Sequence, residues 1–380
     1  MNFDEIRSFR DEEIPHIIET LLEEKQFLNV LSTVFPLVPK NVLKEKFGTV
    51  RTVKQFQYEW DYPLLKSWED TKTSGIELRG VENIDTSKSY VFISNHRDIL
   101  LDAAFLCIKL MEKNLDTVEI AIGDNLLIFP WIKDLVRINK SFIVRRGLNI
   151  KDLLLASKEL SAYIRHDITE RGQSVWLAQR EGRAKNSDDR TQESILKMLN
   201  MSGEGDFVSN LQTLNICPLT ISYEYDPCDY LKASELQQRR DNPDYHKSPK
   251  DDMRNMETGA LGYKGKVVYQ LSGDISADLD ALKDLQLSKN EQITYIAESI
   301  DKKIHKNYEI YPNNKIAYDL LLKVKKFENE YTLQQKLDFE RYVQLQIQKI
   351  DLPNKDENFL STKLLEMYAN PLINKLKAEN

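Results

Sequence analysis

Short apolar runs alternate with longer amphipathic stretches through the middle of the chain. The runs are rich in Val, Ile, Phe and Tyr and are followed by polar residues, as is typical of strands buried inside a sheet. We therefore expect strands over residues 76–80, 90–93, 118–123, 141–144, 174–178, 216–223 and 266–271. The stretches between them predict helices over residues 103–111, 125–136, 149–165 and 191–201, with Pro130 bending or interrupting the second. This alternation predicts an α/β fold with a mixed, largely parallel sheet flanked by helices.

Helical patterns extend the chain on both sides of this sheet region. Apolar residues recur at helical spacing early in the chain, at Ile14, Ile17, Ile18, Leu21 and Leu22. Late in the chain, charged helices are predicted over residues 290–306, 314–350 and 358–378, whereas 233–262 reads as a charged helix end and an exposed loop. The expected organisation is an N-terminal helical region (1–60), an α/β domain (61–312) and a C-terminal helical region (313–380).

Composition narrows the class of protein. Of the 380 residues, 41% are hydrophobic and 30% are charged, which is typical of a globular chain. The net charge of −7 disfavours a nucleic-acid partner. Three cysteines without metal-ligand spacing indicate a reducing compartment, with neither structural zinc nor disulfides, and Cys107 is expected in the core. The chain start lacks a signal-peptide pattern and no apolar run is long enough to span a bilayer, so we expect any membrane contact to be peripheral.

The first chemical candidate follows the strand at 90–93 and reads Ser-Asn-His-Arg-Asp-Ile-Leu-Leu-Asp over residues 94–102. Its His96 is one of only five histidines, and a histidine beside a carboxylate can take a proton from a hydroxyl near neutral pH. Asp102 is the preferred partner, because a carboxylate between Leu101 and Ala103 in an apolar helix is costly unless it is paired. Asp98 is the fallback and also suits a helix N-cap. The competing interpretation of His96 is a helix-capping or core histidine.

Three further segments place polar residues at strand ends. Lys140, Arg145 and Arg146 flank the strand that contains Phe142, and they suit either an anion site or a solvated strand end. After the strand at 174–178, a turn through Glu181 and Gly182 brings cations that could close on a phosphate or form an ordinary charged loop; they are Arg180, Arg183 and Lys185. The fourth segment begins a strand with Cys217-Pro218 and is weak evidence alone.

In this order and spacing, the four segments resemble the glycerolipid acyltransferase family, which includes glycerol-3-phosphate and 1-acylglycerol-3-phosphate acyltransferases. The family's first block is a histidine and an aspartate separated by four residues, whereas five residues separate His96 from Asp102. The second block matches residues 142–145, with Lys140 where many members carry glycine. The third, Glu-Gly-x-Arg, is one residue shorter here at 181–183, and the fourth matches 217–218. The resemblance covers roughly residues 76–275 and indicates a divergent member.

The resemblance implies an O-acyltransferase of membrane lipid synthesis. His96 would deprotonate an acceptor hydroxyl that attacks an acyl thioester, Asp102 would orient the ring, and no cofactor or metal would be needed. The donor would be acyl-CoA or acyl carrier protein, and the acceptor glycerol-3-phosphate, a lysophospholipid or a related lipid or polyol phosphate. Candidate substrate-binding residues are Asn95, Arg97, Lys140, Phe142, Arg145, Arg146, Glu181, Gly182, Arg183 and Lys185, with Pro218 on the acyl side.

The family acts at membranes, so we expect a cytoplasmic protein bound peripherally to the inner face of the membrane. Trp131, with Phe129, Ile132 and Lys133, is a candidate membrane contact, although a core helix beside Pro130 fits the same residues. Two alternatives remain open: a lipid or thioester hydrolase that uses the same His/Asp pair, and a non-catalytic lipid-binding protein.

Overall fold

A seven-stranded sheet forms the centre of the molecule in the computed structural model, which describes residues 2–380, so that only Met1 of the predicted N-terminal region lies outside it. The strand order is β1-β7-β6-β2-β5-β3-β4. All seven strands lie where the apolar runs predict them: β1 (Ile76–Arg79), β2 (Val91–Ser94), β3 (Glu119–Gly123), β4 (Ser141–Val144), β5 (Val175–Ala178), β6 (Ile216–Tyr223) and β7 (Val267–Leu271).

Neighbouring strands pair in parallel except β6 and β7, which are antiparallel. This arrangement confirms the predicted mixed, largely parallel sheet. The central strand β2 lies between β5 and β6, with Val91 opposite both Val175 and Ile216. Every residue of β2 and β6 is buried, as continuous apolar runs predict for strands covered on both faces.

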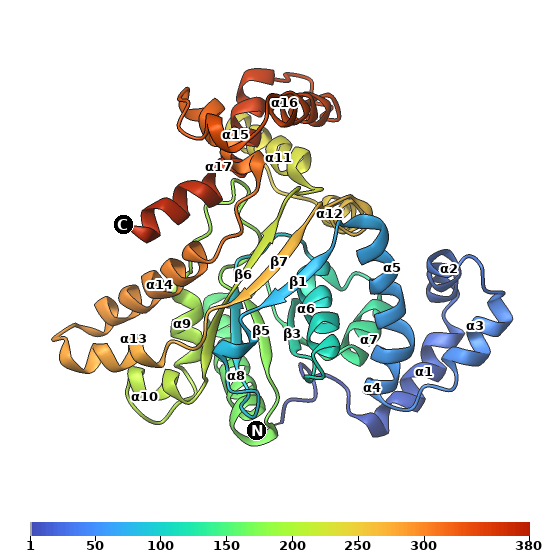
Figure 1. Cartoon of the computed structure of the whole chain (residues 1–380). Coiled ribbons are helices and arrows are strands. Elements are labelled where there is room, and N and C mark those ends of the chain that lie inside the picture. Colours follow the sequence, from blue (N-terminus) through green and yellow to red (C-terminus); the bar gives the residue numbers. More distant parts are fainter. Residues whose placement is uncertain (1) are drawn as a thin grey trace.

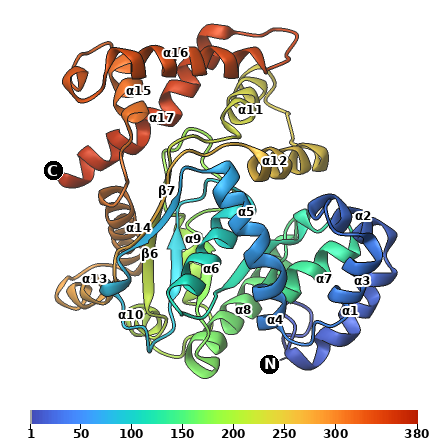
Figure 2. The same cartoon turned by 45° about the vertical axis from the view of Figure 1, so that its right-hand side comes forward.

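Helices cover both faces of the sheet. On one face, α5 (Tyr62–Lys72) and α6 (Leu101–Glu112) pack over Phe92 and Trp176, and Figure 2 shows both helices in front of the strands. The opposite face, which includes Val91 and Phe142, is covered by α8 (Ile150–His166), α9 (Glu193–Leu199), α10 (Phe207–Gln212), α13 (Ser276–Ala281) and α14 (Lys289–Lys306). Cys107 is buried in α6, which confirms that it is a core residue.

The N- and C-terminal extensions are helical, as predicted (Figure 1). Each has a hydrophobic cluster of its own. The N-terminal helices α1 (Ile14–Glu23), α2 (Lys25–Val34), α3 (Lys40–Phe47) and α4 (Val53–Phe56) pack around Phe47 and against Ile138 of α7 (Pro130–Ile138). Tyr368 lies in the C-terminal cluster, which is built from α11 (Asp229–Asp241), α15 (Pro312–Leu322), α16 (Leu333–Gln348) and α17 (Glu357–Glu379). The proposed division of the chain at residues 60 and 312 stays a prediction.

Three predicted helical boundaries are wrong, each for a local reason. The helix expected over 125–136 begins only at Pro130, which takes the first helical position because it lacks an amide donor. The helix expected over 314–350 is two helices, because Lys323 adopts a left-handed conformation (φ 54°) and ends α15. The loop expected within 233–262 contains α12 (Pro249–Leu261), which Ser248 and Asp251 start with a capping box.

None of the helices between residues 2 and 380 combines the length and apolar character that crossing a bilayer requires.

Candidate active site

The loop after the central strand β2 is held at both of its ends. Asn95, at the first position after the strand, bonds both backbone groups of Ile221 in β6: its Nδ2 donates to the carbonyl at 2.8 Å, and its Oδ1 accepts from the amide at 2.8 Å. Arg97 is buried and pairs with Asp189, with Nη2 2.7 Å from Oδ2. The two anchors on either side of His96 therefore leave its side chain little freedom to move.

His96 and Asp102 form a hydrogen-bonded pair. Nδ1 of the imidazole lies 2.8 Å from Oδ2 of Asp102, which is fully buried at the start of α6. The same oxygen accepts from the backbone amides of Arg97, at 2.6 Å, and Asp98, at 3.1 Å. Because Nδ1 is engaged, Nε2 is the nitrogen that remains for a reaction partner.

Asp98 has a different position from Asp102. Its Oδ1 accepts from the amides of Leu100 and Leu101, both at 2.9 Å, and so caps the start of α6, which fits the helix-capping alternative. Burial, and then the neighbouring Asp102 carboxylate, raise the pKa of Asp98. Its Oδ2 lies against Gly259 of α12, where a Cβ would come within 2.2 Å of it. Only glycine therefore allows α12 to pack this closely on the His96 loop.

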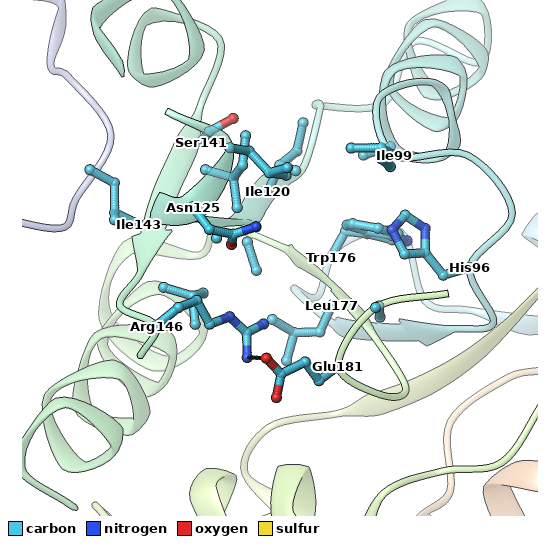
Figure 3. Close-up of a pocket in the computed structure, with 18 of the residues that line it drawn as sticks. His96, Ile99, Ile120, Asn125, Ser141, Ile143, Arg146, Trp176, Leu177 and Glu181 are labelled. Atoms are coloured by element: carbon cyan, nitrogen blue, oxygen red, sulfur yellow. Dashed lines mark ion pairs between the residues drawn. The ribbon is translucent and has the colours of Figure 1, made fainter. Parts of the chain in front are cut away.

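A cavity of about 760 Å³ opens beside His96 at the carboxyl ends of β2, β3, β4 and β5, and it reaches along the sheet to Ser141, the first residue of β4 (Figure 3). Parallel α/β sheets usually bind ligands at this edge. The imidazole of His96 stands edge-on to the indole of Trp176, with ring centroids 5.6 Å apart. The side chain of His96 is 13% exposed. Most of the walls are apolar and come from α5, α6, β3, β4, α8 and α9.

Cations gather on the polar side of the cavity, and most of them are paired. Arg145 pairs with Glu159 at 3.2 Å, and Arg146 pairs with Glu181 at 3.1 Å, an interaction drawn in Figure 3. Lys185 pairs with Glu235 of α11 at 2.8 Å, and burial, helped by the nearby Arg183, lowers the pKa of Lys185 to about 8.

Two further arginines of the same loop differ in their partners. Arg183 is buried, and its Nη2 donates to Asn255 of α12 at 2.7 Å. Arg180 lines the cavity, and its buried Nε has no hydrogen-bond partner in the described part of the chain. Arg180 is therefore the cation with the most capacity left for a bound anion.

The structure brings seven of the predicted site residues to the cavity wall: His96, Arg145, Arg146, Glu181, Gly182, Arg183 and Lys185. The other seven are not among the described residues that line it. Asp98 and Asp102 lie behind His96, in the positions given above. Asn95 and Arg97 are occupied in the anchors described above. Lys140 precedes β4 between two residues that line the cavity, Asn139 and Ser141, but its Nζ is held by Asp116 and Gln173. Phe142 points into the core against Tyr163, and Pro218 is buried within β6 opposite Ile93.

Sequence reasoning missed other residues of the cavity. Lys247 and Asp252, which pair with each other, enter it from the α12 region that was expected to be a loop. Asp61 lies at the end of a π-helical turn over Gln57–Asp61 and lines the cavity from the side of α5. No sequence motif marks these residues; only the capping pattern Ser-Pro-x-Asp before α12 signals a helix there.

Comparisons with known proteins identify one family model that matches the middle of the chain. Residues 75–222 match the sequence model of the family described as Acyltransferase, a range that includes His96, Asp102 and the cations of the cavity loops. The match confirms the resemblance to acyltransferases. No curated protein matches the chain. A solved structure that it resembles is the 1-acyl-sn-glycerophosphate (LPA) acyltransferase PlsC from Thermotoga maritima, with 13% identity, a TM-score of 0.39, and coverage of 78% of this chain and 95% of that one.

Proposed function

We propose, from the match of residues 75–222 to the acyltransferase family model, that the protein is an O-acyltransferase. It moves a fatty acyl group from an acyl thioester to the hydroxyl of a phosphorylated glycerolipid-type acceptor. The donor is acyl-CoA or acyl carrier protein, and the acceptor is glycerol-3-phosphate, a lysophospholipid or a related molecule. The observation that carries the proposal is the His96–Asp102 pair at the edge of a cavity with apolar walls on one side and arginines on the other.

In the proposed reaction, Nε2 of His96 takes the proton of the acceptor hydroxyl as its oxygen attacks the thioester carbonyl. The tetrahedral intermediate collapses, the C–S bond breaks, and the imidazolium returns the proton to the departing thiolate, so that an ester and a free thiol form. Asp102 keeps Nδ1 protonated and stabilises the imidazolium through the 2.8 Å hydrogen bond. Base catalysis of this kind supplies about 10²–10⁴-fold, and positioning supplies much of the rest.

We assign the two substrates to different walls of the cavity. The acyl chain lies along the apolar side, which includes Leu65, Ala104, Ile120 and Trp176. The phosphate of the acceptor lies against Arg180, because guanidinium groups bind phosphate through paired hydrogen bonds and the buried Nε of this one has no partner among the described residues. Arg146 and Lys185 add positive charge around it, reduced by Glu181 and Glu235.

A membrane contact is expected for a lipid acceptor, and the first turns of α8 suit it better than Trp131. Trp131 is half-buried against Phe27 and donates from Nε1 to Gln26 at 3.3 Å. By contrast, four large apolar residues of α8 are 50–89% exposed, and one of them, Leu153, lines the cavity; the four are Ile150, Leu153, Leu154 and Leu155. Lys151 and Lys158 flank them and outnumber the one acid of these turns, Asp152, which leaves a small positive charge for an anionic bilayer. The cytoplasmic, inner-face location stays a prediction.

The proposal is tested by supplying the purified protein with labelled acyl-CoA or acyl carrier protein and a panel of hydroxyl acceptors, and by identifying the products by mass. We expect an acylated product that requires a phosphorylated acceptor. Release of free fatty acid at the same rate without an acceptor would indicate that the protein is a hydrolase and not a transferase. Saturable lipid binding without any turnover would indicate a non-catalytic lipid-binding protein.

A further inference from the structure

One end of the cavity is polar, although the walls that lead to it are apolar. Three polar side chains from separate elements line the cavity there: Asp61 ends the π-helical turn before α5, Asn139 follows α7, and Ser141 is the first residue of β4. Asp61 and Asn139 also line one small neighbouring pocket together, and Asn139 is two residues before Ser141. Figure 3 shows Ser141 beside Ile120, its register partner on β3, on the far side of the cavity from His96. None of these three groups belongs to the proposed proton-transfer or phosphate-binding residues.

The hydrogen-bonding capacity of this end is incompletely used. Oδ2 of Asp61 is buried and has no partner among the described residues. Asn139 is fixed through its oxygen, which accepts from Gln57 at 2.8 Å, while Gln57 in turn accepts from Thr117 at 2.9 Å. The amide donors of Asn139 are thereby left for another acceptor. π-Helical turns are rare and occur frequently at functional sites, and this one positions both Gln57 and Asp61.

The chemistry of this end suits a neutral group. Burial raises the pKa of Asp61 to about 8, and no neighbouring charge contributes, so the carboxyl is protonated near neutral pH. Lys140 lies next to Asn139 in sequence but is held outside by Asp116. A protonated carboxyl, a hydroxyl and an amide donor together offer both donors and acceptors, as a ligand hydroxyl requires.

The path from His96 to this end suits an extended chain. Ser141 on β4 is three strands away from β2, a separation on the order of 14 Å. The sheet surface between them carries Ile120 and Trp176, which are register partners, and Leu65 and Ala104 face the same cavity. A molecule whose reacting end is at His96 therefore meets apolar walls first and polar groups last.

We propose that Asp61, Asn139 and Ser141 form a subsite for a hydroxyl group near the distal end of the acyl chain, which makes hydroxylated acyl thioesters the preferred donors. This inference rests on the proposed acyl transfer, whose chemistry at His96 it does not change. The hydroxyl of the chain donates to and accepts from the groups that are otherwise left without partners, whereas an unsubstituted chain leaves them unsatisfied.

The test compares matched acyl-CoA pairs, with and without a terminal hydroxyl, for dodecanoyl, tetradecanoyl and hexadecanoyl chains. Binding of the corresponding free fatty acids is measured by calorimetry, which does not depend on turnover. For at least one chain length we expect the wild-type protein to bind the hydroxylated member about tenfold more tightly than the unsubstituted one. This ratio corresponds to the free energy of one or two buried hydrogen bonds. Asp61→Leu should reverse this preference, Ser141→Ala should weaken it, and Asp61→Asn, which keeps a donor and an acceptor, should preserve most of it.

Two controls separate a ligand site from a structural role. Asp70→Leu, an exposed change on the neighbouring α5, should leave the preference unaltered. Asp61→Leu should raise the melting temperature, and more at pH 8 than at about pH 5, because an acid with a raised pKa costs increasing stability as pH rises toward that pKa. A lower melting temperature would indicate a structural acid and overturn the inference.

Other outcomes distinguish this inference from the proposed function. Equal binding of both fatty acids by the wild-type protein at every chain length, with normal transfer of unsubstituted chains, would overturn the subsite and leave the acyltransferase intact. Tighter binding of the hydroxylated fatty acid, without transfer to any acceptor, would support the subsite and contradict the proposed acyl transfer.

Discussion

Arg180 differs from Arg145, Arg146 and Lys185 because it has no acidic partner within residues 2–380, and from Arg183 because its buried Nε is left without an acceptor there. Arg145, Arg146 and Lys185 are each neutralised by a glutamate within 3.2 Å, so an incoming anion must compete with that carboxylate. The buried Nε of Arg180 has no partner to give up. We therefore propose that the free energy of binding an acceptor phosphate depends more on this guanidinium than on those of its neighbours.

We predict that Arg180→Gln raises the KM for a phosphorylated acceptor by about 10–100-fold with little change in kcat. This increase corresponds to the binding free energy of one hydrogen bond to a charged group. Steady-state kinetics with varied acceptor concentration measures the effect. Arg190→Gln is the matched control, because Arg190 is half-exposed, pairs with Asp188 and lies outside the cavity wall in the described structure. An equal effect of both substitutions, or a change in kcat alone, would remove Arg180 from phosphate binding.

At the residue scale, the sequence predicts the His96–Asp102 geometry because both residues lie within one turn and one helix start. Sequence reasoning fails for side chains whose position depends on which end of a strand they follow or precede. Lys140 precedes its strand and Arg145 follows it, so the two cations lie at opposite ends of β4, although they are close in sequence. The sequence predicts that Arg97 binds substrate. In the structure, Arg97 instead forms an ion pair with Asp189, which lies much later in the chain.

The helix α8 has two parts with different environments. Its later turns bury Leu160, Tyr163 and Ile164 against the sheet. Its first turns leave Leu154 and Leu155 each 59% exposed beside the cavity. Exposed apolar clusters of this kind mark interaction surfaces. The acyl chain proposed for the neighbouring cavity makes a lipid bilayer the partner that we propose for this one.

We predict that Leu154→Ser together with Leu155→Ser weakens binding to phosphatidylglycerol vesicles by at least about tenfold, because two leucines lose their burial in lipid. Vesicle co-sedimentation measures this. The same change at Leu333 and Leu337 of α16, which are 73% and 50% exposed, is the matched control and should have no effect. Undiminished binding of the α8 variant would show that the contact lies elsewhere.

At the element scale, the strands are predictable because each short apolar run is buried on both faces. Helix ends are harder to predict from the sequence, because each one depends on a few individual contacts. The break after α15 is fixed by Asp319, whose carboxylate accepts from the amides of Lys326 and Phe327 and from the hydroxyl of Tyr331. Nothing in the charged sequence of 314–350 distinguishes this aspartate from the other acids around it.

The C-terminal region supports the site from a distance. Asn370 and Asn374 of α17 bond Asn186 and Asp188, in the loop that carries Arg180 and Lys185. Lys375 donates to the backbone carbonyl of Tyr308 at 2.8 Å. The hydroxyl of Tyr308 bonds Asp189, the partner of Arg97. The His96 loop is thus braced by residues that carry no motif, and such long-range pairs cannot be predicted from one sequence.

The central claim is that a single imidazole, oriented by Asp102 in this framework, removes the proton of the acceptor. Asp98→Asn is the natural control for the acid, because an amide oxygen can still accept the two backbone bonds that cap α6. An amide at Asp102 cannot stabilise the imidazolium in the same way.

The most direct test is therefore kcat for transfer from acyl-CoA to a phosphorylated acceptor in folded His96→Ala, Asp102→Asn and Asp98→Asn variants. We predict a loss of about 10²–10⁴-fold for His96→Ala, a large loss for Asp102→Asn and a much smaller one for Asp98→Asn. Turnover retained by His96→Ala, or a greater loss from Asp98→Asn than from Asp102→Asn, would contradict the account.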